Sequence, residues 1–132
     1  MKNKTKLCGQ EGFNQFYSDL FGPRWEALKE SFFQENQSVE YKIQNCESYF
    51  LDSASVFAAL CLPLQDAQNI LDLCAAPGGK TLVLASRMPE EAKLFSNERS
   101  TSRVSRLKKV VETCLPGQIN ERVKVSCSDG ST

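Results

Sequence analysis

The chain has 132 residues and no histidine. Histidine is the commonest general base and the commonest transition-metal ligand, so its absence removes the most frequent residue for each of these two roles. The chain has six cysteines, and no two of them lie within four residues of each other, which excludes the closely spaced pairs that zinc sites use. They are Cys8, Cys46, Cys61, Cys74, Cys114 and Cys127. We therefore expect free thiols in a reducing compartment and no metal ion.

Long apolar runs and an excess of charge of either sign are also missing. No run is long enough to span a bilayer, and the lysine-rich start at residues 1–6 is not followed by the apolar core of a signal peptide. The 16 basic and 16 acidic residues balance, so no overall field attracts a polyanion. We expect a cytoplasmic protein without membrane contact, long enough to bury a core of its own.

The pattern around which the chain is organised lies at residues 69–85. A short apolar run at 69–74 is followed by the turn AAPGG at 75–79 and by a second apolar run at 81–85. This order predicts a strand, a glycine-rich elbow and the first turn of a helix. Adjacent glycines let a ligand approach the backbone, and a helix N-terminus offers unpaired N–H donors. In α/β proteins this geometry holds nucleotide-like cofactors at the carboxyl ends of the strands.

The segments before this elbow favour helices. Aromatic residues recur at helical spacing over residues 13–33, with a break at Gly22-Pro23. We interpret them as a core-facing helix pair that covers the sheet, and a base-stacking platform is the alternative. Residues 34–47 are polar and loop-like, around a short strand at 39–43, and form the candidate hinge. A third helix begins after Asp52 or Ser53 and ends before Pro63.

The segments after the elbow alternate between helix and strand. We expect strands at residues 93–97 and 122–127, and an amphipathic helix between them at 99–114. Three helices followed by β-α-β-α-β predict an α/β fold with a parallel sheet and right-handed crossovers. The predicted division is an N-terminal helical segment at residues 1–47 and a cofactor-binding domain at residues 48–132.

Two familiar phosphate-binding motifs do not fit the elbow. Gly79-Lys80-Thr81 matches the end of a P-loop, but that motif needs a glycine five residues before Gly79, where Cys74 stands. Pro77 also has no N–H with which to bind a phosphate. The dinucleotide fingerprint G-x-G-x-x-G is absent as well. The remaining choice is a cofactor with an adenosine end and no pyrophosphate.

Two acidic residues at later strand ends agree with such a cofactor. Glu98 follows the second strand, about 20 residues after the elbow glycines, which is the sequence separation at which an acid binds ribose hydroxyls. Asp129 follows the third strand, where it could accept a hydrogen bond from the adenine amino group. Taken singly, Glu98 could be a charge at the start of the next helix, and Asp129-Gly130 could be an ordinary turn. Together with the elbow, they predict an S-adenosylmethionine site.

Several motifs resemble the Sun/Fmu-type RNA (cytosine-5)-methyltransferase family. DLCAAPGGKT closely resembles its cofactor-binding motif, and YFLDSASVFAALCLPL resembles the lead-in to that motif. SNERSTSRVSRLKKVVE and VKVSCSDG are similar to its second and third motifs, and FYSDLFGPRWEALKESF to the N-terminal helical segment of bacterial members. The resemblance covers nearly the whole chain.

The resemblance implies a Rossmann-like fold and transfer of a methyl group from S-adenosylmethionine to carbon 5 of cytosine in ribosomal or transfer RNA. It implies that the elbow cradles the methionine and ribose side of the cofactor. The elbow residues are Cys74, Ala75, Ala76, Pro77, Gly78, Gly79 and Lys80. Glu98 would take the ribose hydroxyls, and Asp129 would lie against the adenine.

The chain departs from the family in its cysteines. Family members add a thiolate to carbon 6 and use a second cysteine to release the product. These cysteines lie in Pro-Cys and Thr-Cys motifs on the fourth and fifth strands. Here the sequence stops after the third strand, no cysteine follows a proline, and Cys114, which follows a threonine, lies in a predicted helix. We therefore assign no catalytic residue and expect an incomplete Rossmann-like domain.

Three functional hypotheses remain open at this point. The chain could be the N-terminal portion of an RNA methyltransferase, with the cofactor half-site but without the chemistry. It could instead be half of a split enzyme, completed by a chain that carries the missing strands. Third, it could be a non-catalytic module that binds RNA or a protein partner through basic residues of the helix at 99–114. Those residues are Arg99, Arg103, Arg106, Lys108 and Lys109.

Overall fold

The computed structural model describes residues 8–35 and 38–131. These residues fall into two compact units, which we call the helical unit (8–35) and the α/β unit (38–131). No helix in these two ranges is both long and apolar enough to cross a membrane. The two units are described separately.

The helical unit consists of two helices around one tryptophan. Helices α1 (Gly9–Phe21) and α2 (Arg24–Ser31) are separated at Gly22 and Pro23, as predicted. Gly22 has a φ of 56°, in the left-handed region that glycine adopts without strain. Trp25 is 2% exposed, and its ring stacks on that of Tyr17 with the centroids 5.2 Å apart. The predicted packing of this pair on the sheet stays a prediction.

The α/β unit begins with a hairpin that the sequence only partly indicated. Strand β1 (Ser38–Tyr41) pairs antiparallel with β2 (Tyr49–Asp52). The predicted strand at 39–43 is therefore present, while β2 was expected only as the lead-in to a helix. Because this pairing ties β1 to the second unit, the compact units divide at residues 36–37 and not after residue 47.

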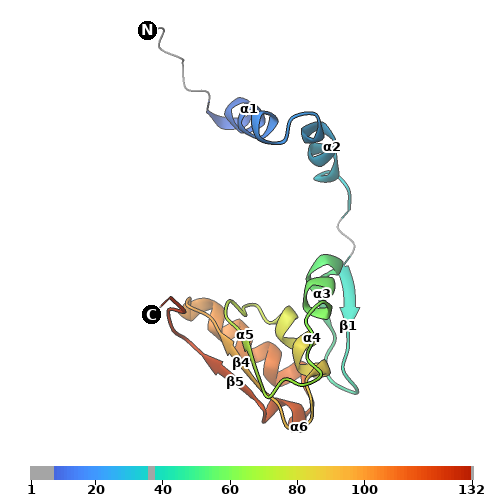
Figure 1. Cartoon of the computed structure of the whole chain (residues 1–132), viewed down its shortest axis with the longest axis vertical. Helices are drawn as coiled ribbons and strands as arrows, with labels where there is room; N and C mark the ends of the chain where they lie inside the picture. Colours follow the sequence, from blue (N-terminus) through green and yellow to red (C-terminus); the bar gives the residue numbers. More distant parts are fainter. Residues whose placement is uncertain (1–7, 36–37, 132) are drawn as a thin grey trace. The chain divides into compact units, whose positions relative to one another are not determined.

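A parallel sheet with helices forms the body of the α/β unit, in agreement with the predicted fold class. Its strands are β3 (Asn69–Asp72), β4 (Lys93–Asn97) and β5 (Val123–Ser126), in the order β3-β4-β5. Helix α4 (Gly79–Arg87) connects β3 to β4, and α5 (Thr101–Cys114) with the short α6 (Gly117–Asn120) connects β4 to β5. Helix α3 (Ser53–Leu60) follows the hairpin and packs on α4 (Figure 1). Both crossovers return to a parallel strand, so the three carboxyl ends lie at one edge of the sheet.

The two faces of this sheet differ in burial. Ile70, Leu94 and Val123 are buried in the core, together with Leu82 of α4 and Leu107 of α5. On the opposite face Leu71 is 63% exposed, opposite Phe95 in the register, and the ammonium of Lys124 lies 5.9 Å from the centre of the Phe95 ring. Parallel sheets are usually buried on both faces. Within the α/β unit as described, one face of this sheet stays open.

Candidate functional site

The elbow has the predicted order of strand, turn and helix. β3 ends at Asp72 and α4 begins at Gly79, and Gly78 caps this helix with a φ of 119°. The Ala76–Pro77 peptide bond is cis. The amide of Ala75 donates to the carbonyl of Asn97 over 2.8 Å, which fastens the elbow to the end of β4.

The structure shows a packing reason for glycine at positions 78 and 79, which differs from the one we expected. A Cβ atom on Gly78 would lie 2.9 Å from Cγ1 of Val110, on α5. A Cβ atom on Gly79 would lie 3.0 Å from Cε1 of Tyr49, in β2. These glycines therefore leave room for neighbouring elements of the fold. The expectation that they leave room for a ligand stays a prediction.

A hollow of about 310 Å³ opens at the carboxyl ends of the three strands. We call it the strand-end hollow. It is lined by Leu73, Cys74, Asn97, Glu98, Arg99, Arg103, Asp129, Gly130 and Ser131. The structure thus brings together Cys74, Glu98 and Asp129, which the sequence had placed at three successive strand ends. The other predicted residues, Ala75, Ala76, Pro77, Gly78, Gly79 and Lys80, belong to the elbow but are not among those that line the hollow.

Glu98 is the buried acid of the hollow, and its side chain is only 6% exposed. One carboxylate oxygen accepts a hydrogen bond from the amide of Ser100 over 2.9 Å, at the start of α5. The other oxygen lies 3.4 Å from Nη1 of Arg103 and accepts no hydrogen bond from the described residues. Glu98 therefore does bond to the start of the next helix, yet keeps one buried oxygen without a hydrogen-bond donor among the described residues.

Arg103 connects Glu98 to the elbow. Its Nη2 atom donates a hydrogen bond of 2.6 Å to the carbonyl of Ala76, while Nη1 pairs with Glu98. Both terminal nitrogens of the Arg103 guanidinium thus have partners at the hollow. Arg99 lies 3.4 Å from Asp129, in a more exposed pair.

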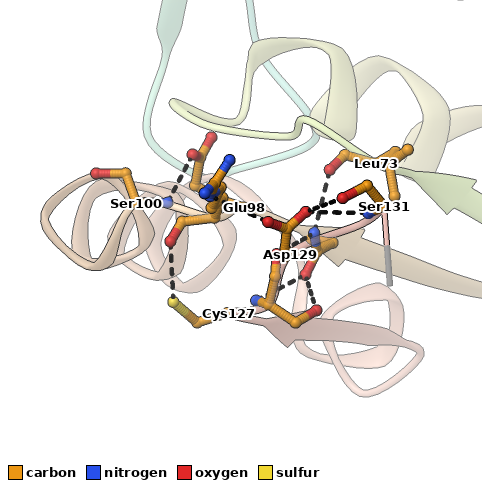
Figure 2. A network of polar contacts seen from close by, with 9 residues as sticks. Leu73, Glu98, Ser100, Cys127, Asp129 and Ser131 are labelled. Carbon is orange, nitrogen blue, oxygen red and sulfur yellow. Dashed lines mark hydrogen bonds and ion pairs between the residues drawn. The ribbon is translucent and has the colours of Figure 1, made fainter.

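Asp129 lies at the mouth of the hollow, in the turn after β5 (Figure 2). One oxygen of its carboxylate accepts hydrogen bonds from the hydroxyl and the amide of Ser131, over 2.7 and 3.0 Å. The other lies 3.4 Å from Nε of Arg99. The hydrogen bonds from Ser131, first from its hydroxyl and then from its amide, lower the pKa of Asp129. Asp129 therefore both forms the expected turn and presents a stable carboxylate to the hollow.

Lys80 points elsewhere in the described structure. Its ammonium donates to the hydroxyl of Ser55 over 3.2 Å, near the start of α3. Asp52 caps that helix by accepting from the amide of Ser55 over 2.8 Å, and this bond is the main cause of its lowered pKa. Asp72, at the end of β3, has a raised pKa because it is buried, although a hydrogen bond from Thr81 opposes the shift. Lys80 and both acids thus form a second polar group between α3 and α4.

Asn97 was missed by sequence reasoning. It is 5% exposed and lines the hollow directly before Glu98. The signal that could have found it is its place, because a polar side chain at the end of a buried strand needs hydrogen-bond partners within the protein. No group of three or more metal-ligating side chains occurs in residues 8–35 and 38–131.

The chain is similar to several known proteins. The family model for "16S rRNA methyltransferase RsmB/F" matches residues 59–132. The 5-cytosine rRNA methyltransferase NSUN4 of Bos taurus is 44% identical over 84 residues, which cover 62% of this chain and 22% of NSUN4. This chain therefore spans about a fifth of the length of that relative.

Two solved structures share the fold. NSun6 from Pyrococcus horikoshii with SFG matches with a TM-score of 0.51 and 24% identity, over 62% of this chain and 20% of that one. An O-methyltransferase from Bacillus cereus in complex with SAH matches with a TM-score of 0.51 and 19% identity, over 90% of this chain and 50% of that one. The likeness to both is a likeness of fold.

Proposed function

The chain belongs to the family of 16S rRNA methyltransferases RsmB/F, and we propose that it is the cofactor-binding part of an S-adenosylmethionine-dependent RNA (cytosine-5)-methyltransferase. The observation that carries the proposal is the meeting of three strand ends at one hollow with a buried acid. The name of the bovine relative favours ribosomal RNA as the substrate, and transfer RNA is the alternative that the sequence resemblance leaves open. The cytoplasmic location expected from the sequence stays a prediction.

The residues of the hollow fit the adenosyl part of this cofactor. The buried oxygen of Glu98 that accepts no hydrogen bond is suited to a ribose hydroxyl, because an unsatisfied buried carboxylate oxygen is costly. Asp129 would accept from the adenine amino group, and Cys74 and the rest of the elbow would lie toward the methionine side. When bound, the cofactor supplies the methyl group that is transferred. What this chain contributes is binding and orientation.

A calorimetric titration tests the proposal. We expect S-adenosylmethionine to bind and ATP not to bind, because the elbow lacks the first glycine of a P-loop. Glu98→Gln should weaken the binding of S-adenosylmethionine by about tenfold, since a hydrogen bond to a charged group contributes roughly 1.5–3 kcal/mol. Glu112→Gln is the matched control, because it makes the same change on the exposed surface of α5. Binding of ATP instead of S-adenosylmethionine would contradict the proposal.

We propose further that the open face of the sheet is covered by polypeptide that carries the remaining strands, from the same protein or a complementing chain. Leu71 is 63% and Leu73 45% exposed, on a strand that has a neighbour on one side only within the described residues. Exposed apolar surface beside an unpaired strand edge favours pairing with another segment.

Co-expression tests this second proposal. We expect the chain to co-purify with a polypeptide that carries the family's later strands and cysteines, and Leu71→Lys to abolish the complex. Phe33→Lys removes an exposed apolar side chain from the helical unit, so it should leave the complex intact. A chain that stays monomeric and soluble at high concentration, with no affinity for that polypeptide, would count against covering of this face.

A further inference from the structure

The side chain of Asn97, at the end of β4, makes hydrogen bonds to the ends of the two neighbouring strands, β3 and β5. Its Nδ2 atom donates to the carbonyl of Leu73, after β3, over 3.3 Å and to the carbonyl of Ser128, after β5, over 3.0 Å. Its Oδ1 atom accepts from the hydroxyl of Ser126 over 2.9 Å, and from the amide and the hydroxyl of Ser128 over 3.1 and 2.7 Å. Asn97 itself ends β4.

The backbone at the same position adds to this connection. The carbonyl of Asn97 accepts from the amide of Ala75 over 2.8 Å, and the amide of Glu98 donates to the carbonyl of Ser126 over 3.1 Å. The side chain of Asn97 is buried, so water does not compete strongly for these bonds. The three strand ends are thus fixed to one another through a single residue.

Each of these strand ends directly precedes an acid or thiol that lines the hollow. Leu73 precedes Cys74, Asn97 precedes Glu98, and Ser128 precedes Asp129. A shift of any one strand end would therefore move a side chain that we expect to contact the cofactor. Asn97 does not need to touch the cofactor itself to control where these groups stand.

We propose that Asn97 is the positioning residue of this site, whose amide holds Glu98 and Asp129 in register for contact with the adenosyl group. The proposal rests on the proposed cofactor function. Asparagine suits the role because it donates and accepts at one position. Aspartate has the same shape but no donor, and it would set a carboxylate against the carbonyls of Leu73 and Ser128. A small loss of register at a binding site lowers affinity even where the fold persists.

The test is a titration with S-adenosylmethionine of the full chain, wild type, Asn97→Asp and Ser96→Ala. We expect Asn97→Asp to weaken the affinity by at least about tenfold, as two donated hydrogen bonds are lost, with the stoichiometry unchanged. Ser96→Ala should stay near wild type, because the hydroxyl of Ser96 is buried without a hydrogen-bond partner in the described residues. A purely structural role for Asn97 would lower the stoichiometry and leave the dissociation constant of the folded molecules unchanged, which would overturn the proposal.

A double-mutant cycle tests whether Asn97 acts through Glu98. If it does, adding Asn97→Asp to Glu98→Gln should weaken binding less than adding it to the wild type. Full additivity of the two losses would contradict the proposal.

The side-chain hydrogen bonds of Asn97 to the strand ends form what we call the clamp. Hydrogen exchange tests the clamp without any ligand. In Asn97→Ala the amide of Ser128, which loses its acceptor Oδ1 of Asn97, should exchange at least about tenfold faster, whereas the amide of Val83 in α4 should not change. Unchanged exchange at Ser128 would refute the clamp whether or not the cofactor binds. If the wild type fails to bind S-adenosylmethionine while Ser128 responds as expected, the failure lies with the proposed function and the clamp stands.

Discussion

Arg103 is the side chain that holds Glu98 against the elbow, and its loss should affect stability as well as binding. Arg103→Met removes the ion pair to Glu98 and the hydrogen bond to Ala76. Glu98 is buried, so the substitution would leave a buried carboxylate without its charged partner. We expect the free energy of unfolding to fall by about 1–3 kcal/mol, measured by urea denaturation at neutral pH.

Arg99→Met is the matched control for this prediction. It also removes an ion pair at the hollow, but the Arg99 side chain is 79% exposed, and exposed pairs contribute only about 0–1 kcal/mol. The two arginines should therefore differ in their effect on stability. Equal losses for Arg103→Met and Arg99→Met would mean that the burial of Glu98 does not decide the strength of its pair.

Gly78 is a second residue whose replacement should act through packing. Its φ of 119° is one that side-chain-bearing residues rarely adopt, and a Cβ atom there would meet Val110. We expect Gly78→Ala to lower the free energy of unfolding by about 1–3 kcal/mol through backbone strain alone, with the steric contact in addition. Thermal unfolding without ligand measures the effect.

Two further variants separate the causes at Gly78. Adding Val110→Ala should recover the steric part of the loss and leave the part due to φ. Gly117→Ala should be nearly neutral, because Gly117 does not have a positive φ and no atom lies within 4 Å of its added Cβ. If Gly78→Ala proved as harmless as Gly117→Ala, the conformation of the elbow would be different from the one described.

At the scale of elements, Asp72 at the end of β3 and Asp52 at the start of α3 should change the stability of the fold with pH in opposite directions. Burial raises the pKa of Asp72 above its ordinary value, so the folded chain binds this proton more tightly and loses stability as the pH rises through that pKa. Asp72→Asn keeps an acceptor for Thr81 and removes the buried charge. We expect this variant to be more stable than the wild type at pH 7, with a gain that shrinks below about pH 4.

Asp52 provides the comparison. The hydrogen bonds from Ser55 lower its pKa, so its contribution is present above the ordinary pKa of aspartate and is lost as the pH falls through the lowered value. Asp52→Asn should therefore be less stable than the wild type at pH 7, and the difference should vanish in acid. Melting temperatures of both variants between pH 3 and pH 7 provide the measurement. A shift of the same sign for Asp52→Asn and Asp72→Asn would contradict the environments described for these two carboxylates.

The elements also show what the sequence could and could not predict. The strand, elbow and helix around Gly78 were predictable because apolar periodicity and glycine act locally. The β1–β2 pairing was not, because it joins short segments through contacts that no local pattern encodes. Glu98 and Asp129 were found from their places after strands. Asn97 was missed, because its role depends on carbonyls and hydroxyls at the ends of two other strands, β3 and β5.

The glycines show a similar limit of sequence reasoning. The pattern predicted that Gly78 and Gly79 let a ligand approach the backbone, whereas the structure shows that a Cβ atom at either position would meet side chains of the protein. The nearest of these neighbours, Val110 and Tyr49, lie about 30 residues away in the sequence on either side. Which atoms fill the space beside a glycine depends on tertiary packing, which a single sequence does not specify.

At the scale of the whole molecule, the chain has a hollow at one edge of its sheet, and its cysteines do not match the motifs that the family resemblance implies. Of its cysteines, Cys74 lines the hollow and Cys114 is buried in α5, and Cys127 bonds weakly to the carbonyl of Arg99. None of them stands in the Pro-Cys or Thr-Cys strand motifs of the family. Carbon 5 of cytosine is too weak a nucleophile to accept a methyl group without prior addition of a thiolate at carbon 6.

We therefore expect the isolated chain to bind S-adenosylmethionine without methylating RNA. With radiolabelled cofactor and a ribosomal RNA fragment, incorporation should stay at the level of a no-protein control. Addition of a polypeptide with the later strands and cysteines should raise it, and Glu98→Gln should then lower it through the affinity for the cofactor. Turnover by the isolated chain that survives replacement of Cys74, Cys114 and Cys127 by serine would show that these thiols are not needed as nucleophiles. In that case the methyl transfer would have to follow a different chemistry from that of the family.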